Sequence, residues 1–203
     1  MNDLIQSLIQ TKVLRSKSVI KAFHKIDRKD FVLDIYADLA YNDTPLAIDH
    51  GQTISQPTTV ALMLEWLDVR EGQTVLDIGA GSGWQTVLLA ELVGASGHVH
   101  ACERIPELCE FARQNLARYP QYKERISLHC ESAVNGWPKS APYNRIIAAA
   151  SSNEIPDEWL QQLSPDGILV APTDESIFVV KRNSDLSFTK HEHHGFIFVP
   201  FIT

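Results

Sequence analysis

The sequence predicts an α/β fold built on a doubly wound, mostly parallel seven-stranded sheet, with an N-terminal helical extension and a C-terminal antiparallel hairpin. From residue 57 onward, short apolar runs rich in β-branched residues alternate with helical patterns, which is typical of a parallel sheet covered on both faces. The last two apolar runs have no helix between them, so we expect them to pair as a hairpin at one edge of the sheet.

Right-handed crossovers between these strands would give a Rossmann-like order. We expect residues 1–40 to be mostly helical and residues 41–52, rich in Asn, Asp, Pro and Gly, to form a loop. Core helices are expected at 57–67, 84–94, 106–119 and 156–163. Strands are expected at 74–78, 98–103, 126–131, 144–150, 167–172, 177–182 and 195–201.

Length and charge narrow the classes of function. The 203 residues suit a single domain, in which residues 1–56 form the extension and an active-site loop and residues 57–203 the core. The net charge of −7 lacks the positive field that holds nucleic acid, and no apolar run is long enough for a membrane span. We therefore expect no nucleic-acid partner and no membrane partner. The sequence leaves the oligomeric state unknown.

Three cysteines, Cys102, Cys109 and Cys130, show no paired-ligand spacing. We interpret them as free, mostly buried thiols in a reducing compartment, and so expect a cytoplasmic location. The run "HEHH" at 191–194 could be tested as a metal site, but an exposed loop before the last strand is the simpler interpretation, so we expect no metal.

The segment "VLDIGAGSGW" at 75–84 lies where a strand should pass through a loop into a helix. Gly79, Gly81 and Gly83 allow a tight bend and close approach of a ligand. Dinucleotide-binding loops use G-x-G-x-x-G, whereas this spacing is G-x-G-x-G with Asp77 just ahead of it. An acid there would repel a pyrophosphate and favour a sulfonium or an amino group. The pattern therefore favours S-adenosyl-L-methionine over a nicotinamide cofactor.

Glu103 is expected at the end of the next strand, 24 residues beyond Gly79 (103 − 79). A carboxylate at about this spacing can accept hydrogen bonds from both hydroxyls of a ribose. The alternative is a solvated strand-end residue paired with Arg104. Together with the glycine bend, the ribose role is the preferred interpretation.

The polar run "HGQTISQP" at 50–57 precedes an apolar helical pattern. Pro57 suits the first turn of a helix, so Ser55 or Gln56 would fall near its N-cap. A second possibility is that Thr53 and Ser55 present their hydroxyls to a ligand. The two roles need not exclude each other.

Several segments in the same order resemble the protein-L-isoaspartate O-methyltransferase family, from about residue 20 onward. The "QTISQP" segment is the most discriminating of them, because many methyltransferases share the glycine bend. The resembling segments are "IDRKDFV", residues 40–94, "HVHACERIPEL", "GWPKSAPYNRII", "LQQLSPDGILVAP" and "FVPF".

This resemblance implies a class I methyltransferase with S-adenosyl-L-methionine as donor. It implies isoaspartyl residues of damaged proteins and peptides as acceptors, with repair through a methyl ester and a succinimide. It places the family's active-site serine at Ser55. With the motif analysis, the expected cofactor-binding residues are Thr53, Ile54, Asp77, Gly79, Ala80, Gly81, Gly83, Glu103, Arg104, Glu131 and Ser132.

The sequence departs from the family pattern around the expected pocket. Residues 131–133 read Glu-Ser-Ala where the family has Gly-Asp-Gly, Asn144 stands where Asp is common, and Ala149 stands where Thr is common. These departures keep a second hypothesis open, that of a non-catalytic or altered-acceptor protein of the same fold that binds S-adenosyl-L-methionine. A small-molecule or nucleic-acid methyltransferase and a nicotinamide oxidoreductase are further alternatives.

Overall fold

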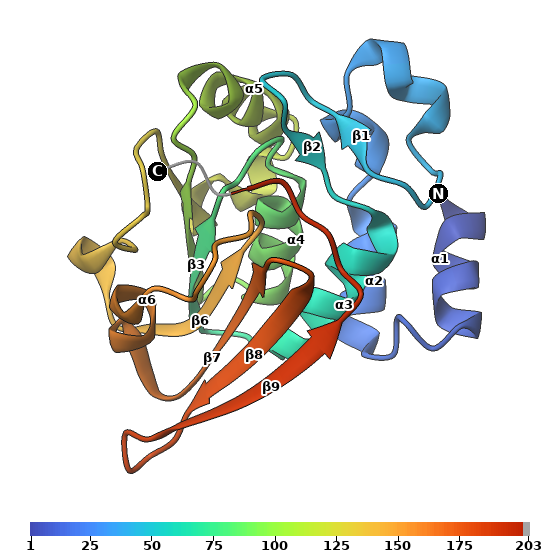
Figure 1. Cartoon of the computed structure of the whole chain (residues 1–203). Coiled ribbons are helices and arrows are strands. Elements are labelled where there is room, and N and C mark those ends of the chain that lie inside the picture. Colours follow the sequence, from blue (N-terminus) through green and yellow to red (C-terminus); the bar gives the residue numbers. More distant parts are fainter. Residues whose placement is uncertain (201–203) are drawn as a thin grey trace.

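The computed structural model describes residues 1–200 and confirms the expected fold class (Figure 1). One seven-stranded sheet has the order β5-β4-β3-β6-β7-β8-β9. The strands from β3 to β7 run parallel to their neighbours, and β8 and β9 are antiparallel. Their bounds are β3 Thr74–Ile78, β4 His98–Cys102, β5 Ile126–His129, β6 Tyr143–Ala148, β7 Leu163–Thr173, β8 Ser176–Arg182 and β9 Phe188–His194.

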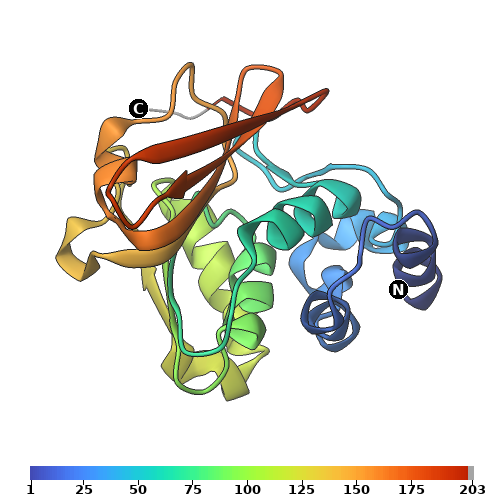
Figure 2. The ribbon, with the colours of Figure 1, turned by 90° about the horizontal axis from the view of Figure 1, so that it is seen from below.

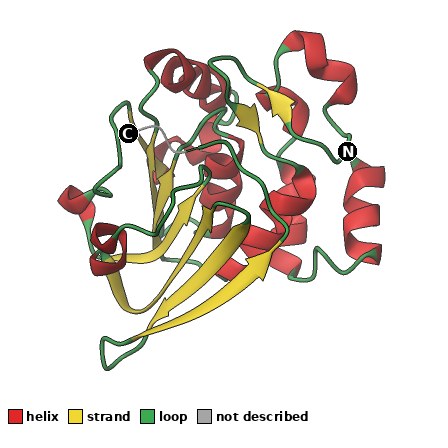
Figure 3. Ribbon diagram, viewed as in Figure 1, coloured by secondary structure: helices red, strands yellow, loops and turns green. Residues whose placement is uncertain are grey.

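Helices cover both faces of the sheet, as Figures 2 and 3 show. Successive strand residues alternate between the faces, so Val75 packs with one helical layer and Leu76 with the other. The first layer is the larger one and contains α3 (Pro57–Leu67), α4 (Trp84–Leu92) and α5 (Pro106–Ala117). The second contains the short helix α6 (Asp157–Gln161).

The N-terminal extension is helical, as expected, and packs on the larger layer. Its apolar residues join the core of α3 and α4, and the Phe23 ring meets Trp84 edge-on at 5.7 Å between centroids. The extension therefore shares one apolar cluster with α3 and α4. Its elements are α1 (Asn2–Gln10), α2 (Lys17–Lys25) and the 3₁₀ turns η1 (Arg28–Phe31) and η2 (Asp34–Leu39).

The expected loop at 41–52 contains a small ribbon. Strand β1 (Leu46–Ala47) pairs antiparallel with β2 (Thr53–Ile54). The turn between them has positive φ at Asp49, His50 and Gly51. The sequence did not predict this ribbon, because the segment is polar and because strands of two residues are too short to show an alternating pattern.

The last strand differs from the expectation. It spans Phe188–His194, so "HEHH" lies in an exposed edge strand and not in a loop. Residues 195–200 are not a strand, and residue 201 lies outside the described residues. The chain leaves the sheet at Gly195 (φ +93°), where the N–H groups of Gly195 and Phe196 donate to the carbonyl of Glu175. An exposed edge strand needs no apolar face, which is why the pattern missed it.

Two of the three cysteines were also interpreted wrongly. Cys109 on α5 and Cys130 just after β5 form a disulfide, with 5.6 Å between their Cα atoms. Because α5 packs beside β5, two residues 21 apart in sequence meet across the helix–strand contact. Only Cys102 is a free, buried thiol. Within residues 1–200, no helix is long and apolar enough to cross a bilayer, and no cluster of three or more metal-ligating side chains occurs.

Two measurements test the disulfide: the number of free thiols, and the free energy of unfolding before and after reduction. Thiol titration of protein unfolded without reductant should find one free thiol, and three after reduction. Reduction should also lower the free energy of unfolding by about 3 kcal/mol, because it releases a loop of this size in the unfolded chain. Finding three free thiols in the oxidised, unfolded sample would contradict the pairing.

Candidate functional site

The glycine bend follows β3 directly and starts α4. The N–H groups of Gly79 and Ala80 donate to the carbonyl of Cys102 at the end of β4 (2.9 and 3.0 Å). Gly79, Gly81 and Gly83 have φ of +83°, +54° and +85°, a region that side-chain-bearing residues rarely adopt. The three glycines therefore permit the tight turn that the backbone makes between the strand and the helix.

Asp77 is buried beneath this bend and stabilises it through hydrogen bonds to α4. Its side chain is fully buried, and its two oxygens accept hydrogen bonds from Gln85 Nε2 (2.8 Å) and Thr86 Oγ1 (2.6 Å) on α4. Burial raises the pKa of Asp77 to about 6 against the opposing effect of these hydrogen bonds, and the nearby charge of Glu103 adds to the rise. Asp77 thus ties the helix to the strand beneath the bend.

Glu103 holds the bend from the side. One carboxylate oxygen accepts the N–H of Gly81 and the other accepts the N–H of Ile105, both at 2.9 Å. Each oxygen keeps a second lone pair for a further donor. The carboxylate is buried in the protein and still forms part of the pocket wall, where its free lone pairs could accept ligand hydroxyls.

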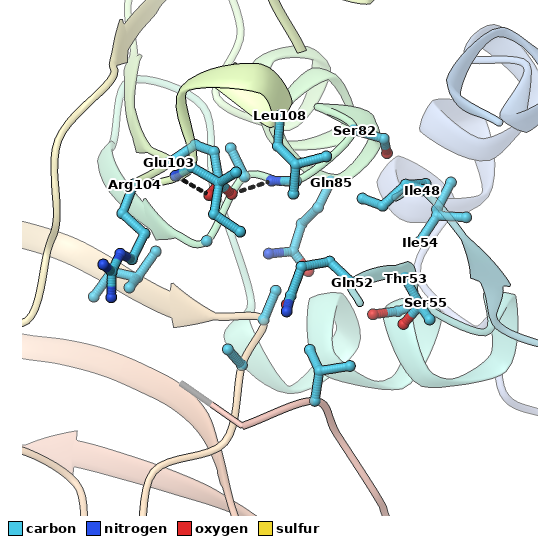
Figure 4. Close-up of a pocket in the computed structure, with 18 of the residues that line it drawn as sticks. Ile48, Gln52, Thr53, Ile54, Ser55, Ser82, Gln85, Glu103, Arg104 and Leu108 are labelled. Atoms are coloured by element: carbon cyan, nitrogen blue, oxygen red, sulfur yellow. Dashed lines mark hydrogen bonds between the residues drawn. The ribbon is translucent and has the colours of Figure 1, made fainter. Parts of the chain in front are cut away.

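A pocket lies over the bend, with about 810 Å³ of empty space including its open mouth. It sits at the carboxyl ends of β3 and β6, where chain connections diverge to opposite sides of the sheet, the usual ligand site of open α/β sheets. In Figure 4, Glu103 and Arg104 lie on one side, Thr53 and Ser55 lie on the other, and Gln52 is between them.

Ser55 forms the pocket wall opposite Glu103. It directly follows β2, where alternation buries the side chain of Ile54, and Ser55 itself is half-buried. Among residues 1–200 its hydroxyl has no hydrogen-bond partner in the protein. The residue at the N-cap of α3 is Gln56, without a side-chain cap. Asp43 accepts the Thr58 N–H instead (2.8 Å), so the capping interpretation of Ser55 was wrong.

Nine of the twelve expected site residues line this one pocket: Thr53, Ile54, Ser55, Gly79, Ala80, Gly81, Glu103, Arg104 and Glu131. Three expected residues lie outside its lining. Asp77 is sealed beneath the bend, and Gly83 caps α4 against Leu116. Ser132 is exposed, and its hydroxyl accepts the N–H of Val134.

Other lining residues were not expected. Gln52 and Gln85 bring amides to the pocket, and Val199 and Pro200 close its wall from the C-terminal segment. Gln52 belongs to the quoted polar run, so the motif could have included it. Trp84 also lines the pocket, and its Nε1 is buried without a hydrogen-bond partner in residues 1–200.

Comparisons with known proteins agree with this geometry. The family model described as protein-L-isoaspartate(D-aspartate) O-methyltransferase matches residues 1–203. The chain belongs to this family. A protein-L-isoaspartate O-methyltransferase of Hyperthermus butylicus is 40% identical and covers 98% of this chain and 87% of its own. One of Methanothrix thermoacetophila is 43% identical and covers 92% and 89%.

Solved structures give the same result for the fold. A protein-L-isoaspartate O-methyltransferase superposes with a TM-score of 0.89 at 27% identity, covering all of this chain and 66% of its own. A putative family member from Plasmodium falciparum, in complex with S-adenosyl-L-homocysteine, has a TM-score of 0.85 at 24% identity and covers 98% and 96%. Family membership confirms the expected enzyme class and S-adenosyl-L-methionine cofactor, and it does not favour the non-catalytic alternative.

The residues present fit this cofactor. The glycine bend leaves open space beside Gly79, where an added Cβ would meet no atom closer than Ala149 Cβ at 4.0 Å, whereas a Cβ on Gly81 would crowd Ile48 Cδ1 at 3.3 Å. Glu103 offers free lone pairs to hydroxyls, and Ile105, Leu108 and Ala133 give one end of the pocket an apolar surface suited to a flat base.

The Asp77→Asn variant tests the anchor beneath the bend. A native pKa near 6 lies above the ordinary value of 3.8, so the stabilisation from protonating Asp77 is present at low pH and is lost as the pH rises through about 6. The asparagine mimics the protonated acid: its oxygen accepts from Gln85 and its amide donates to Thr86. Between about pH 4 and pH 7, the free energy of unfolding of the variant should therefore rise by roughly 2–3 kcal/mol relative to that of the wild type. Urea unfolding at each pH measures this difference. A pH-independent difference would contradict the raised pKa.

Proposed function

We propose that this chain transfers a methyl group from S-adenosyl-L-methionine to the free carboxylate of isoaspartyl residues in damaged proteins and peptides. The observation that carries this proposal is the meeting of Ser55 and the glycine bend in one pocket. The names of the curated relatives support the choice of acceptor. The neighbouring backbone nitrogen would then attack the methyl ester, close a succinimide and release methanol, and hydrolysis of the succinimide would return part of the product to normal aspartate.

In this proposal each wall of the pocket has its own task. The bend at Gly79, Ala80 and Gly81 and the carboxylate of Glu103 hold the donor. Thr53, Ile54, Arg104 and Glu131 complete its surroundings. When bound, the donor supplies a methyl group on a positively charged sulfur.

Ser55 would orient the acceptor. An aspartyl-type carboxylate is ionised near pH 7 and needs no general base. The protein has to align the acceptor oxygen and remove part of its water, and such positioning can supply about 7–11 kcal/mol in favourable cases. The Ser55 hydroxyl, without a partner within residues 1–200, is free to donate to that oxygen, while Ile54 and Val199 exclude water.

The departures from the family pattern do not all bear on this chemistry. Asn144 lies away from the pocket, where its side chain accepts the Thr74 N–H at 2.9 Å. Ser132 is outside the pocket lining too. Glu131, Ala133 and Ala149 line the pocket, and the backbone N–H of Ala149 donates to the carbonyl of Ile78. A changed acceptor preference or a weaker hold on the donor would therefore be traced first to these three residues.

Two expectations remain proposals. A cytoplasmic location was inferred from free thiols, and the Cys109–Cys130 disulfide weakens that reasoning; cell fractionation would test it. The absence of a nucleic-acid partner rests on the acidic net charge and can be tested by a gel-shift titration.

Ser55→Ala should lower kcat by about 10²–10³-fold, the typical cost of one hydrogen-bond donor lost at a reacting oxygen. The dissociation constant for S-adenosyl-L-methionine, measured by calorimetry, should change by less than about threefold. Ser132→Ala, an exposed serine outside the pocket, is the matched control and should keep full turnover. Equal losses of turnover and donor affinity in Ser55→Ala would contradict the orienting role.

A peptide panel tests the acceptor. With labelled donor, a peptide containing isoaspartate should accept methyl groups, and its L-aspartyl twin should not, because only the former carries its free carboxylate on the α-carbon. A D-aspartyl twin measures stereochemical tolerance. Donor binding without transfer to any of the three peptides would support the non-catalytic alternative.

A further inference from the structure

A buried arginine connects the two walls of the pocket. Arg28 begins the 3₁₀ turn η1 in the N-terminal extension, and its side chain is fully buried. We propose that Arg28 is a positioning residue that holds the Ser55 segment against the donor side of the pocket. This inference rests on the proposed methyl transfer and adds to it a residue that does not line the pocket.

The guanidinium of Arg28 donates hydrogen bonds to four backbone carbonyls between residues 40 and 55. Its Nη1 donates to the carbonyls of Ala40 (2.7 Å) and Asn42 (3.4 Å), and its Nη2 donates to those of Thr44 (3.0 Å) and Ser55 (3.1 Å). Its Nε has no partner in residues 1–200, so these four bonds make up its hydrogen bonding. One side chain thus joins both ends of the segment that carries the β1–β2 ribbon.

The same guanidinium also contacts Trp84, on the side of the pocket that is proposed to hold the methyl donor. Its Cζ lies 5.3 Å from the ring centroid of Trp84, which is within the range of a cation–π contact. Trp84 is the first residue of α4, directly after the glycine bend, and lines the pocket. Arg28 therefore fixes the carbonyl of Ser55 relative to the element that begins at the bend.

The remaining contacts of the segment are few on its exposed side. Residues 42–45 and 49–51 are exposed. Besides Arg28, two polar contacts within residues 1–200 join this part to the core. The carboxylate of Asp43 accepts from both the N–H and the hydroxyl of Thr58 (2.8 and 2.6 Å), and the ring of His50 lies 4.0 Å from the carboxylate of Glu107 on α5. Burial lowers the pKa of Arg28 to about 10 despite the nearby charge of Asp43, and the group still carries its charge near neutral pH.

Lysine cannot replace this arginine. A lysine keeps the charge but offers a single nitrogen, whereas the planar fork of arginine spreads donors over two nitrogens. Arg28→Lys should therefore release some of the four carbonyls and let Ser55 shift. A displacement of about 1 Å at a reacting group can cost about 10²-fold in rate.

The experiment compares Arg28→Lys with Arg145→Lys. Arg145 is also buried and donates to a backbone carbonyl, that of Asp68 (3.1 and 2.9 Å), but it does not line the pocket. Arg28→Lys should lower kcat for an isoaspartyl peptide by about 10–100-fold while the dissociation constant for S-adenosyl-L-methionine stays within about threefold. Arg145→Lys should lower the melting temperature without this loss of kcat.

A double-mutant cycle separates a positioning role from general destabilisation. If Arg28 acts through Ser55, Arg28→Lys should lower kcat much less in a Ser55→Ala background than in the wild type. Full additivity, a parallel loss of donor affinity, or equal effects of the two lysine variants would overturn the proposal. If Arg28→Lys does not fold, Asp43→Asn loosens the same segment from its exposed side and should show the same pattern more weakly; unchanged kcat in that variant would also overturn it.

Failure of the Arg28 proposal can be distinguished from failure of the proposed methyl transfer. Wild-type protein is assayed first, and absence of transfer there counts against the function itself. Limited proteolysis of segment 41–56 supplies a readout independent of activity: Arg28→Lys should be cut faster in this segment than both the wild type and Arg145→Lys. An unchanged cleavage rate would overturn the role of Arg28 even in an inactive protein.

Discussion

The divergence of the chain at the carboxyl ends of β3 and β6 is the constraint on which the rest of the site depends. The two strands are parallel neighbours, but the chain leaves β3 toward α4 and leaves β6 toward the opposite face. A hollow must remain between the two exits, because no connection crosses it. The glycine bend exists to turn the chain sharply away from that hollow, and Asp77 and Glu103 hold the bend in its turned form.

The division of labour between the two acids follows from their depth. Both lie close to the bend, but Asp77 satisfies its oxygens entirely with α4 side chains, whereas Glu103 uses backbone N–H groups and still forms part of the pocket surface. The acid next to the motif in sequence, Asp77, therefore stabilises the architecture, and the acid from the neighbouring strand, Glu103, is the one that faces the pocket. The carboxylate of Glu103 can reach the pocket because it follows the end of β4, whereas the carboxylate of Asp77, although next to the glycine motif, is buried beneath the bend.

The sequence predicted the seven-stranded sheet and most of the residues that line the pocket, because apolar periodicity and glycine spacing are local properties. It could not place β9, whose exposed residues carry no apolar signal, or the disulfide, whose partners meet only through packing of α5 on β5. It also assigned Asp77 to the ligand, since the spacing says where an acid lies but not how deeply. Arg28 lies in the quoted segment "IDRKDFV", but its role has no local signal, because its partners are backbone carbonyls, which every residue possesses.

The segment of residues 195–200 supplies one wall of the pocket from outside the regular elements of the sheet. Val199 accepts the N–H of Ser151 (2.9 Å), and with Pro200 it closes the pocket wall that begins at Ser55. This part of the wall belongs to no helix or strand, and backbone hydrogen bonds to Ser151 and Glu175 hold it in place. Its detachment would open one side of the pocket while the glycine bend and Glu103 kept their own contacts.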